Sequence, residues 1–153
     1  MKKEFNWNKW TRKTHYWGAF VIILPISIVI TTGILLQLKK EINWIQPPTS
    51  NGEHVNAPTI SFDNILASVK TADKANITSW DDVDRLDVRI DKGIVKVRGK
   101  NRWEVQVDTQ TGDVLQVAYR RSDLIESFHD GSCFHDKVKI WLFLPSGIIL
   151  FVL

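Results

Sequence analysis

The apolar stretch WGAFVIILPISIVITTGILLQL, residues 17–38, decides the fold, because it contains no Asp, Glu, Lys, Arg or His. As a helix with a rise of about 1.5 Å per residue it is roughly 33 Å long, against a hydrocarbon core of roughly 30 Å. A soluble domain of 153 residues is too small to surround such a helix at one of its ends. A cleaved signal peptide is disfavoured, because this stretch is longer than the apolar core of a signal peptide and is not followed by a small-residue cleavage site. The stretch therefore predicts a transmembrane helix over residues 17–40.

Charge predicts the orientation of this helix. Residues 1–16, expected to be a basic and aromatic interfacial segment, carry five basic residues and one acidic residue, a net charge of +4. Residues 41–138 carry 12 basic and 16 acidic residues, a net charge of −4. Because positive charge concentrates on the inner side of a membrane, we expect a cytoplasmic N-terminus and a periplasmic segment 41–138 in a bacterial inner membrane. Four basic residues near the second apolar segment oppose this orientation: Arg120, Arg121, Lys137 and Lys139.

The same charge distribution bears on partners and on redox compartment. The overall pI of about 9.0 comes from the basic tail and the flanks of the apolar segments, which argues against nucleic acid as a partner. The single Cys133 excludes an intrachain disulfide. A domain without disulfides is compatible with a periplasmic location but does not prove it. The lipid bilayer is therefore the first partner that we expect.

A small α+β domain is predicted between the apolar segments. Residues 41–57 contain the breaker cluster PPTSNG and are expected to be a linker. The next segment has apolar residues at i, i+3, i+4 and i+7, which predicts an amphipathic helix with Ser61 as its N-cap. These apolar residues are Phe62, Ile65, Leu66 and Val69.

Beyond residue 80 the apolar period changes from 3.6 to 2, which is typical of strands with one buried face. Four segments alternate in this way, with turn residues between them: 86–90, 95–97, 103–107 and 114–119. We expect an antiparallel four-stranded sheet whose apolar face is covered by the helix. Residues 58–126 would then form one extracytoplasmic module.

A second apolar segment follows an interfacial connector at residues 127–139. Residues 140–153 make only about 21 Å of helix, which is too short to cross a bilayer alone. Either the chain stops inside its second span, which we favour, or the segment is a half-helix packed against partners. With the first span it predicts a transmembrane helical hairpin, so the fold class expected is membrane α+β. Other membrane subunits or a second copy of the chain are the protein partners that this arrangement favours.

Three short motifs are similar to those of a known membrane family. They are KTHYWG at residues 13–18, VDTQTGDV at residues 107–114 and SFHDG at residues 127–131. They resemble the PepSY-associated transmembrane family, although Tyr16 stands where that family usually has Arg. The resemblance implies that residues 58–126 are a PepSY module. Relatives include proteins similar to haem-containing reductases for siderophore iron, and PepSY domains also occur as inhibitory parts of peptidase propeptides.

Histidines are the candidate cofactor ligands. A b-type haem held by two imidazoles needs both on one metal ion, and the candidates are His15, His129 and His135. His15 is expected at the inner end of the first span and the other two outside the second, roughly 30 Å away. One chain would therefore need a partner or a second copy to supply the other ligand. The interpretation that we prefer is that the His-Asp pairs at 129–130 and 135–136 cap and anchor the start of a helix at the outer interface.

No pattern of catalytic or metal-binding residues stands out, so an enzyme is not the favoured interpretation. The first hypothesis is an inner-membrane PepSY protein that acts as a non-catalytic accessory subunit of a larger membrane complex. The alternative is a haem-binding electron-transfer component of a siderophore-iron reductase. A further alternative is an extracytoplasmic regulator that binds a peptidase or a peptide by strand addition.

Overall fold

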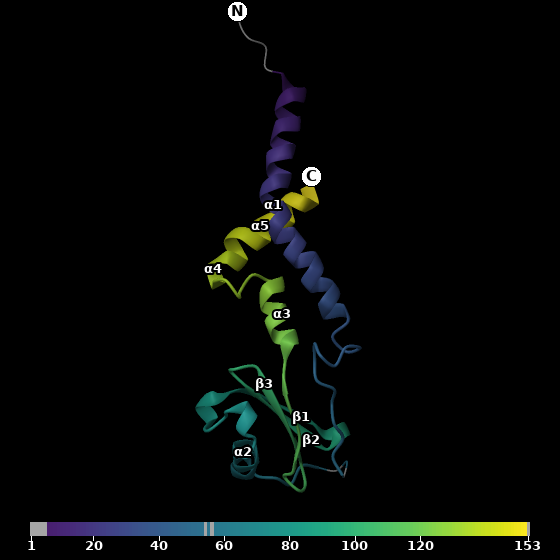
Figure 1. Ribbon diagram of the computed structural model, residues 1–153, viewed down its shortest axis with the longest axis vertical. Coiled ribbons are helices and arrows are strands. Elements are labelled where there is room, and N and C mark those ends of the chain that lie inside the picture. Colours follow the sequence, from purple (N-terminus) through teal and green to yellow (C-terminus); the bar gives the residue numbers. More distant parts are fainter. Residues whose placement is uncertain (1–5, 54, 56, 153) are drawn as a thin grey trace, which may run out of the picture. The chain divides into compact units, whose positions relative to one another are not determined.

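The computed structural model describes residues 6–53, 55 and 57–152, which form two compact units (Figure 1). One unit comprises residues 6–37 and 124–152, and the other comprises the described residues of 38–123. Residues 1–5 of the expected interfacial segment, residues 54 and 56 of the expected linker, and Leu153 lie outside the described residues.

The first unit is built on one long helix, α1, Trp7–Gln37. The helix begins well before the apolar stretch, since the Asn6 side chain caps it by accepting a hydrogen bond from Lys9 N at 3.0 Å. Pro25 lies inside it, and Figure 1 shows the helix axis changing direction about midway. In the part of the chain that the structure describes, α1 is the one helix long and apolar enough to span a bilayer.

The C-terminal part of this unit is helical but irregular. Helix α3, Arg121–His129, is followed by α4, Asp136–Val138, a π-helical turn η4, Lys139–Phe143, and α5, Leu144–Val152. Pro145 has no N–H to donate to the preceding turn, so the bonding of a regular α-helix is interrupted there. Helix α5 packs against α1. The structure thus gives a second apolar helical segment, while the predicted second span remains a prediction.

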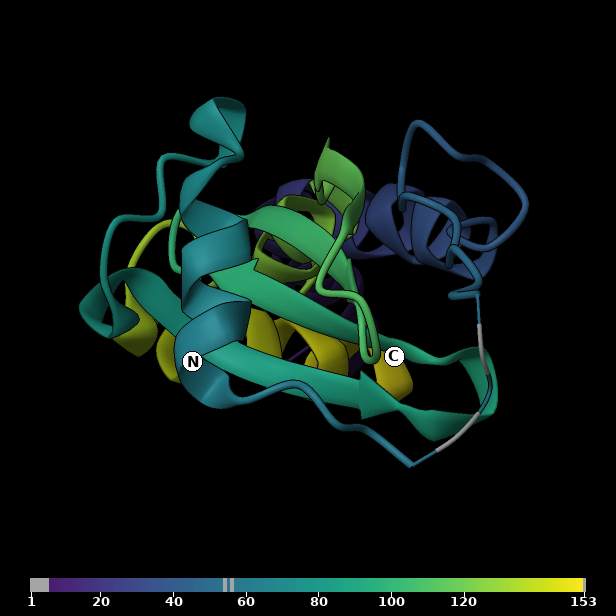
Figure 2. The same cartoon turned by 90° about the horizontal axis from the view of Figure 1, so that it is seen from below.

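The second unit contains the predicted sheet. Its strands are β1, Val83–Arg89, β2, Ile94–Gly99, β3, Trp103–Asp108, and β4, Val114–Tyr119. They pair antiparallel in the order β1-β2-β3-β4. Helix α2, Phe62–Lys70, lies across one face of the sheet (Figure 2). Ser61 caps α2 as predicted, because its hydroxyl accepts a hydrogen bond from Asn64 N at 3.2 Å.

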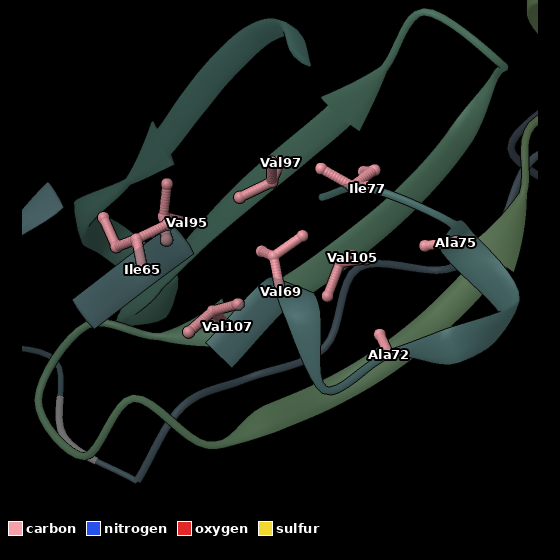
Figure 3. Close-up of a cluster of buried hydrophobic side chains, with 9 residues drawn as sticks. All are labelled: Ile65, Val69, Ala72, Ala75, Ile77, Val95, Val97, Val105 and Val107. Atoms are coloured by element: carbon pink, nitrogen blue, oxygen red, sulfur yellow. The ribbon is translucent and has the colours of Figure 1, made fainter. Parts of the chain in front are cut away.

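Small aliphatic side chains fill the space between α2 and the sheet (Figure 3). The core contains residues of α2, of the segment after it including the turn η1, Asp73–Ala75, and of the two central strands. These residues are Ile65, Val69, Ala72, Ala75, Ile77, Val95, Val97, Val105 and Val107. The prediction that Phe62 covers the sheet is wrong, since its side chain is exposed and its ring packs edge to face against Trp80 at 6.2 Å. Residues 72–77 complete the core instead, because α2 is only 9 residues long.

The opposite face of the sheet is covered as well, by a segment that the sequence suggested was a linker. Residues 45–53, which we call the strap, are held by polar side chains of β2 and β3. Gln106 donates to Pro48 O at 2.9 Å and accepts from Ser50 N at 2.7 Å. Gly52 N donates to Lys92 O at 2.8 Å, and a Cβ on Gly52 would collide with the Gly93 carbonyl and the Asp108 carboxylate. The strap is therefore a fixed part of the second unit, residues 38–123, which we call the module from here on.

Candidate functional site

His129 is held against the C-terminal half of α1. Its Nδ1 lies 3.1 Å from Val29 O and 3.0 Å from Thr32 Oγ1. The carbonyl can only accept, and the Thr32 hydroxyl proton is used in a 2.6 Å bond to Ile28 O. The neutral ring must therefore carry its proton on Nδ1, which leaves Nε2 with a free lone pair. No partner of Nε2 is found among the described residues.

Gly33 allows the His129 ring to come this close to α1. A Cβ at Gly33 would lie 3.4 Å from the His129 Cε1 atom, which is already van der Waals contact, so a side chain that extends beyond Cβ toward the ring would displace it. The glycine at position 33 therefore leaves room for the His129 ring beside α1.

A pocket of about 520 Å³ lies beside His129. Its polar wall is formed by His129, Asp130 and Lys139, and its apolar wall by residues of α1, η4 and α5: Val29, Phe143, Leu144, Gly147, Ile148 and Phe151. Asp130 and Lys139 are joined by a 2.6 Å salt bridge. Partial burial raises the pKa of Asp130, but hydrogen bonds from Lys139 and Ser132 outweigh it and lower that pKa to about 2. The pocket therefore combines an imidazole and an ion pair with a largely apolar lining.

The structure separates the other two candidate histidines from this pocket. His15 is exposed on α1, 14 to 17 residues before the carbonyl and hydroxyl that hold His129, which is about 21–26 Å along the helix. His135 caps α4, since its Nδ1 accepts a hydrogen bond from Lys137 N at 3.1 Å. Among the described residues, no group of three His, Cys, Asp or Glu side chains is arranged to hold a metal ion.

The capping interpretation thus describes one histidine and fails for the other. His135 begins a helix, as that interpretation predicts, whereas His129 is the last residue of α3 and is bonded to α1. Nothing in the sequence pairs His129 with α1, because the residues involved are about 100 positions apart. A glycine inside an apolar helix, here Gly33, is a local signal that another segment could approach α1 closely.

A second cluster of ionisable groups lies under the strap. The Glu104 carboxylate is fully buried, with Arg120 Nη1 at 2.7 Å, Arg98 Nε at 3.4 Å and Lys96 Nζ at 3.5 Å. Burial lowers the pKa of Lys96, and the charge of Glu104 offsets this only in part. The Lys96 ammonium also donates to Thr49 Oγ1 of the strap at 2.7 Å. The cluster therefore ties the strap to the sheet, and its shielding from water marks it as structural.

The hairpin motif at residues 107–114 owes its form to Asp108. Its Oδ1 accepts hydrogen bonds from Gln110 N at 2.7 Å and Thr111 N at 3.0 Å, which shapes the turn between β3 and β4. Its Oδ2 accepts from Glu53 N of the strap at 2.8 Å. Gly112 adopts a φ of 80°, which favours glycine. The fully buried carboxylate of Asp108 is therefore hydrogen-bonded both to the turn and to the strap.

The two ends of the module are joined directly. Ser122 N donates to Ile45 O at 2.8 Å, and Arg121 donates to Trp44 O at 3.2 Å. The Arg121 guanidinium lies 4.8 Å from the centre of the Trp44 ring and 5.7 Å from that of Tyr119. The points where the chain enters and leaves the module are therefore neighbours.

A membrane-length apolar helix, followed by a helix packed on a four-stranded antiparallel sheet, defines a membrane-anchored α+β protein. The family model of the PepSY-associated TM region matches residues 12–153, which is nearly the whole chain. The chain belongs to this family. No curated protein and no solved structure matches it.

Proposed function

We propose that this protein is a non-catalytic accessory subunit of a larger inner-membrane complex, with its PepSY module outside the cytoplasm. The supporting observation is that most of the α1 surface is not covered by the rest of the chain. Only 11% of the most apolar 18-residue segment of this helix is buried, and the buried residues are Ile22 and Pro25. Helix α5 covers only part of α1, which leaves a long apolar surface of α1 for other transmembrane helices.

Cysteine crosslinking in native membranes tests the subunit proposal. In a Cys133→Ser background, Ile30→Cys introduces a thiol at an exposed position of α1, and Ile22→Cys places one at a buried position as the control. We expect Ile30→Cys to crosslink to the same membrane protein in each preparation, and Ile22→Cys to give no product. Crosslinks that form equally from both positions, or none from Ile30→Cys, would contradict a specific assembly.

The proposed topology places residues 41–138 in the periplasm, and it is supported by the excess of positive charge before α1. The single, exposed Cys133 provides a direct test. A membrane-impermeant maleimide should label it in intact cells once the outer membrane is permeabilised, and Cys133→Ser should not react. Labelling that requires lysis of the inner membrane would reverse the orientation.

Haem-mediated electron transfer is a second candidate function, favoured by the hydrogen bond between His129 Nδ1 and Val29 O. A histidine that ligates a metal ion donates its other ring N–H to a backbone carbonyl or carboxylate, as Nδ1 of His129 does to Val29 O. The largely apolar lining of the pocket beside this ring also supports this candidate. His129 would hold the group through Nε2, and another chain would supply a second ligand. When bound, haem accepts and donates single electrons.

Absorption spectra of the purified full-length chain, oxidised and then reduced with dithionite, test this second function. We expect a Soret band that is lost in His129→Ala and kept in His135→Ala, since His135 has its Nδ1 occupied as a helix cap. His15→Ala examines whether that exposed histidine ligates haem in a neighbouring copy. A colourless protein from cells supplied with haem, or an unchanged spectrum in His129→Ala, would exclude the proposed ligand while leaving the subunit proposal intact.

A further inference from the structure

A second groove lies on the N-terminal half of α1, away from the His129 pocket. It has a volume of about 580 Å³. Seven residues of α1 and one of α5 line it: Trp10, Lys13, Thr14, Trp17, Gly18, Val21, Ile22 and Ile149. The α1 residues recur at steps of three and four, so they form one continuous stripe along the helix.

The groove is polar at one end and apolar at the other. Lys13 and Thr14 lie at its N-terminal end between two tryptophans, and Val21, Ile22 and Ile149 lie at the other end. Lys13 and Val21 are separated by about 12 Å along the helix axis. Gly18 keeps the middle open, because no heavy atom lies within 4 Å of the position that a Cβ would take.

Among the described residues, the polar end carries positive charge without a counterion. Residues 6–37 contain Lys9, Arg12 and Lys13 but no acidic residue. Over the described residues, Lys13 makes no salt bridge and the Thr14 hydroxyl has no hydrogen-bond partner, whereas the Thr11 hydroxyl donates to Trp7 O at 2.9 Å. An ammonium group and a hydroxyl, side by side next to indole rings, can together donate hydrogen bonds to a phosphate group.

We propose that this groove binds one anionic phospholipid. Its phosphate contacts Lys13 and Thr14, and an acyl chain runs past Gly18 onto Val21, Ile22 and Ile149. Charge complementarity selects this occupant, since the uncompensated basic end suits an anionic headgroup and the apolar end suits its hydrocarbon. Tryptophan rings flanking the headgroup position are typical of the membrane interface.

Native mass spectrometry of the full chain tests the proposal, after extraction from vesicles with equal amounts of phosphatidylglycerol and phosphatidylcholine. We expect one retained phosphatidylglycerol in the wild-type protein. Lys13→Gln should reduce the preference for phosphatidylglycerol about fivefold, as expected for one lysine near an anionic lipid surface. Arg12→Gln is the matched control, because it removes the same charge from a residue that does not line the groove.

Gly18→Leu gives a second, independent measurement. The added side chain meets no other atom at its Cβ, so the helix should remain intact by circular dichroism while the groove is filled and the lipid is lost. Equal effects of Lys13→Gln and Arg12→Gln would overturn the proposal in favour of diffuse electrostatic attraction. Retention of lipid in Gly18→Leu would also overturn it. So would a lipid-free dimer that Gly18→Leu abolishes, because the groove would then bind a second copy of the chain.

Discussion

At the scale of single residues, Glu104 is the shared counterion of several buried cations. One buried carboxylate lies within 3.5 Å of nitrogens from three cationic side chains: Lys96, Arg98 and Arg120. Removing charges from water costs several kcal/mol per ion, and only close, well-bonded partners offset that cost. Arg120 also has Asp123, at 3.1 Å, but within the described residues Arg98 Nε makes no hydrogen bond. The balance of the cluster therefore depends on Glu104.

Glu104→Gln should destabilise the module by about 3–5 kcal/mol, because it leaves buried cations without their shared counterion. Hydrogen exchange of β2 and β3 amides, measured on the full chain in micelles, gives this free energy. Asp84→Asn is the control, since it breaks an exposed ion pair with Arg85 and should cost less than about 1 kcal/mol. Similar losses in the two variants would show that the buried cluster contributes no more than a surface pair.

Asp82 should make the module sensitive to acid. Its carboxylate accepts hydrogen bonds from Thr78 N at 2.8 Å, from the Thr78 hydroxyl at 2.9 Å and from Ser79 N at 3.0 Å, which lower its pKa below 3.8. A lowered folded-state pKa means that this stabilisation is present above pH 3.8 and is lost as the pH falls through the folded-state value.

The matching experiment compares thermal unfolding of the wild type and Asp82→Asn as a function of pH. The wild-type protein should be more stable at neutral pH, and the difference should shrink as the pH falls below 3.8. Asp81→Asn serves as the control, since the Asp81 side chain accepts no hydrogen bond from any described residue. A difference that stays constant down to low pH would mean that the Asp82 charge has no part in it.

At the scale of elements, the regular parts of the fold follow from local patterns in the sequence. Alternating valines and turn residues predicted all four strands, and the Ser61 cap predicted the start of α2. The strap escaped prediction, because its contacts with Lys96, Gln106 and Asp108 join residues about 47–58 positions apart. Polar side chains that alternate with apolar ones normally face water, so their burial under residues 45–53 has no local signal.

The contact of His129 with α1 was hidden for the same reason, and Gly33→Leu tests it. The larger side chain should displace the imidazole ring, whose Cε1 lies 3.4 Å from the position of a Cβ at Gly33, and break the hydrogen bond to Val29 O. Nitrogen NMR of the His129 ring should then show loss of the single Nδ1–H tautomer. Gly18→Leu on the same helix should leave that signal unchanged. An unaltered tautomer in Gly33→Leu would show that this contact does not control the ring.

At the scale of the whole molecule, each unit contains the interactions that stabilise it. The module has its own core between α2 and the sheet, and the strap covers its charged face from within the same unit. A module boundary at residue 58, as the sequence suggested, would leave the strap behind. Buried charges that lose their cover would be exposed without their partners.

A fragment of residues 41–123 should therefore fold without the membrane helices, and a fragment of residues 55–123 should not. Circular dichroism and the dispersion of amide NMR signals distinguish a folded sheet from a collapsed chain. The core residues are identical in the two fragments, so a difference between them isolates the contribution of the strap. If both fragments fold equally well, the strap is dispensable and its hydrogen bonds contribute little net stability.

The hydrogen bond between Ile45 O and Ser122 N has a consequence for exchanging the module with another domain. Because the two ends of the module are a single hydrogen bond apart, the module resembles a cassette inserted into a loop. Domains with adjacent termini can be inserted or removed with little disturbance to the host chain. An unrelated domain with equally close ends should therefore be exchangeable for residues 45–122, which would turn the helices of this protein into a general carrier for display at a membrane surface.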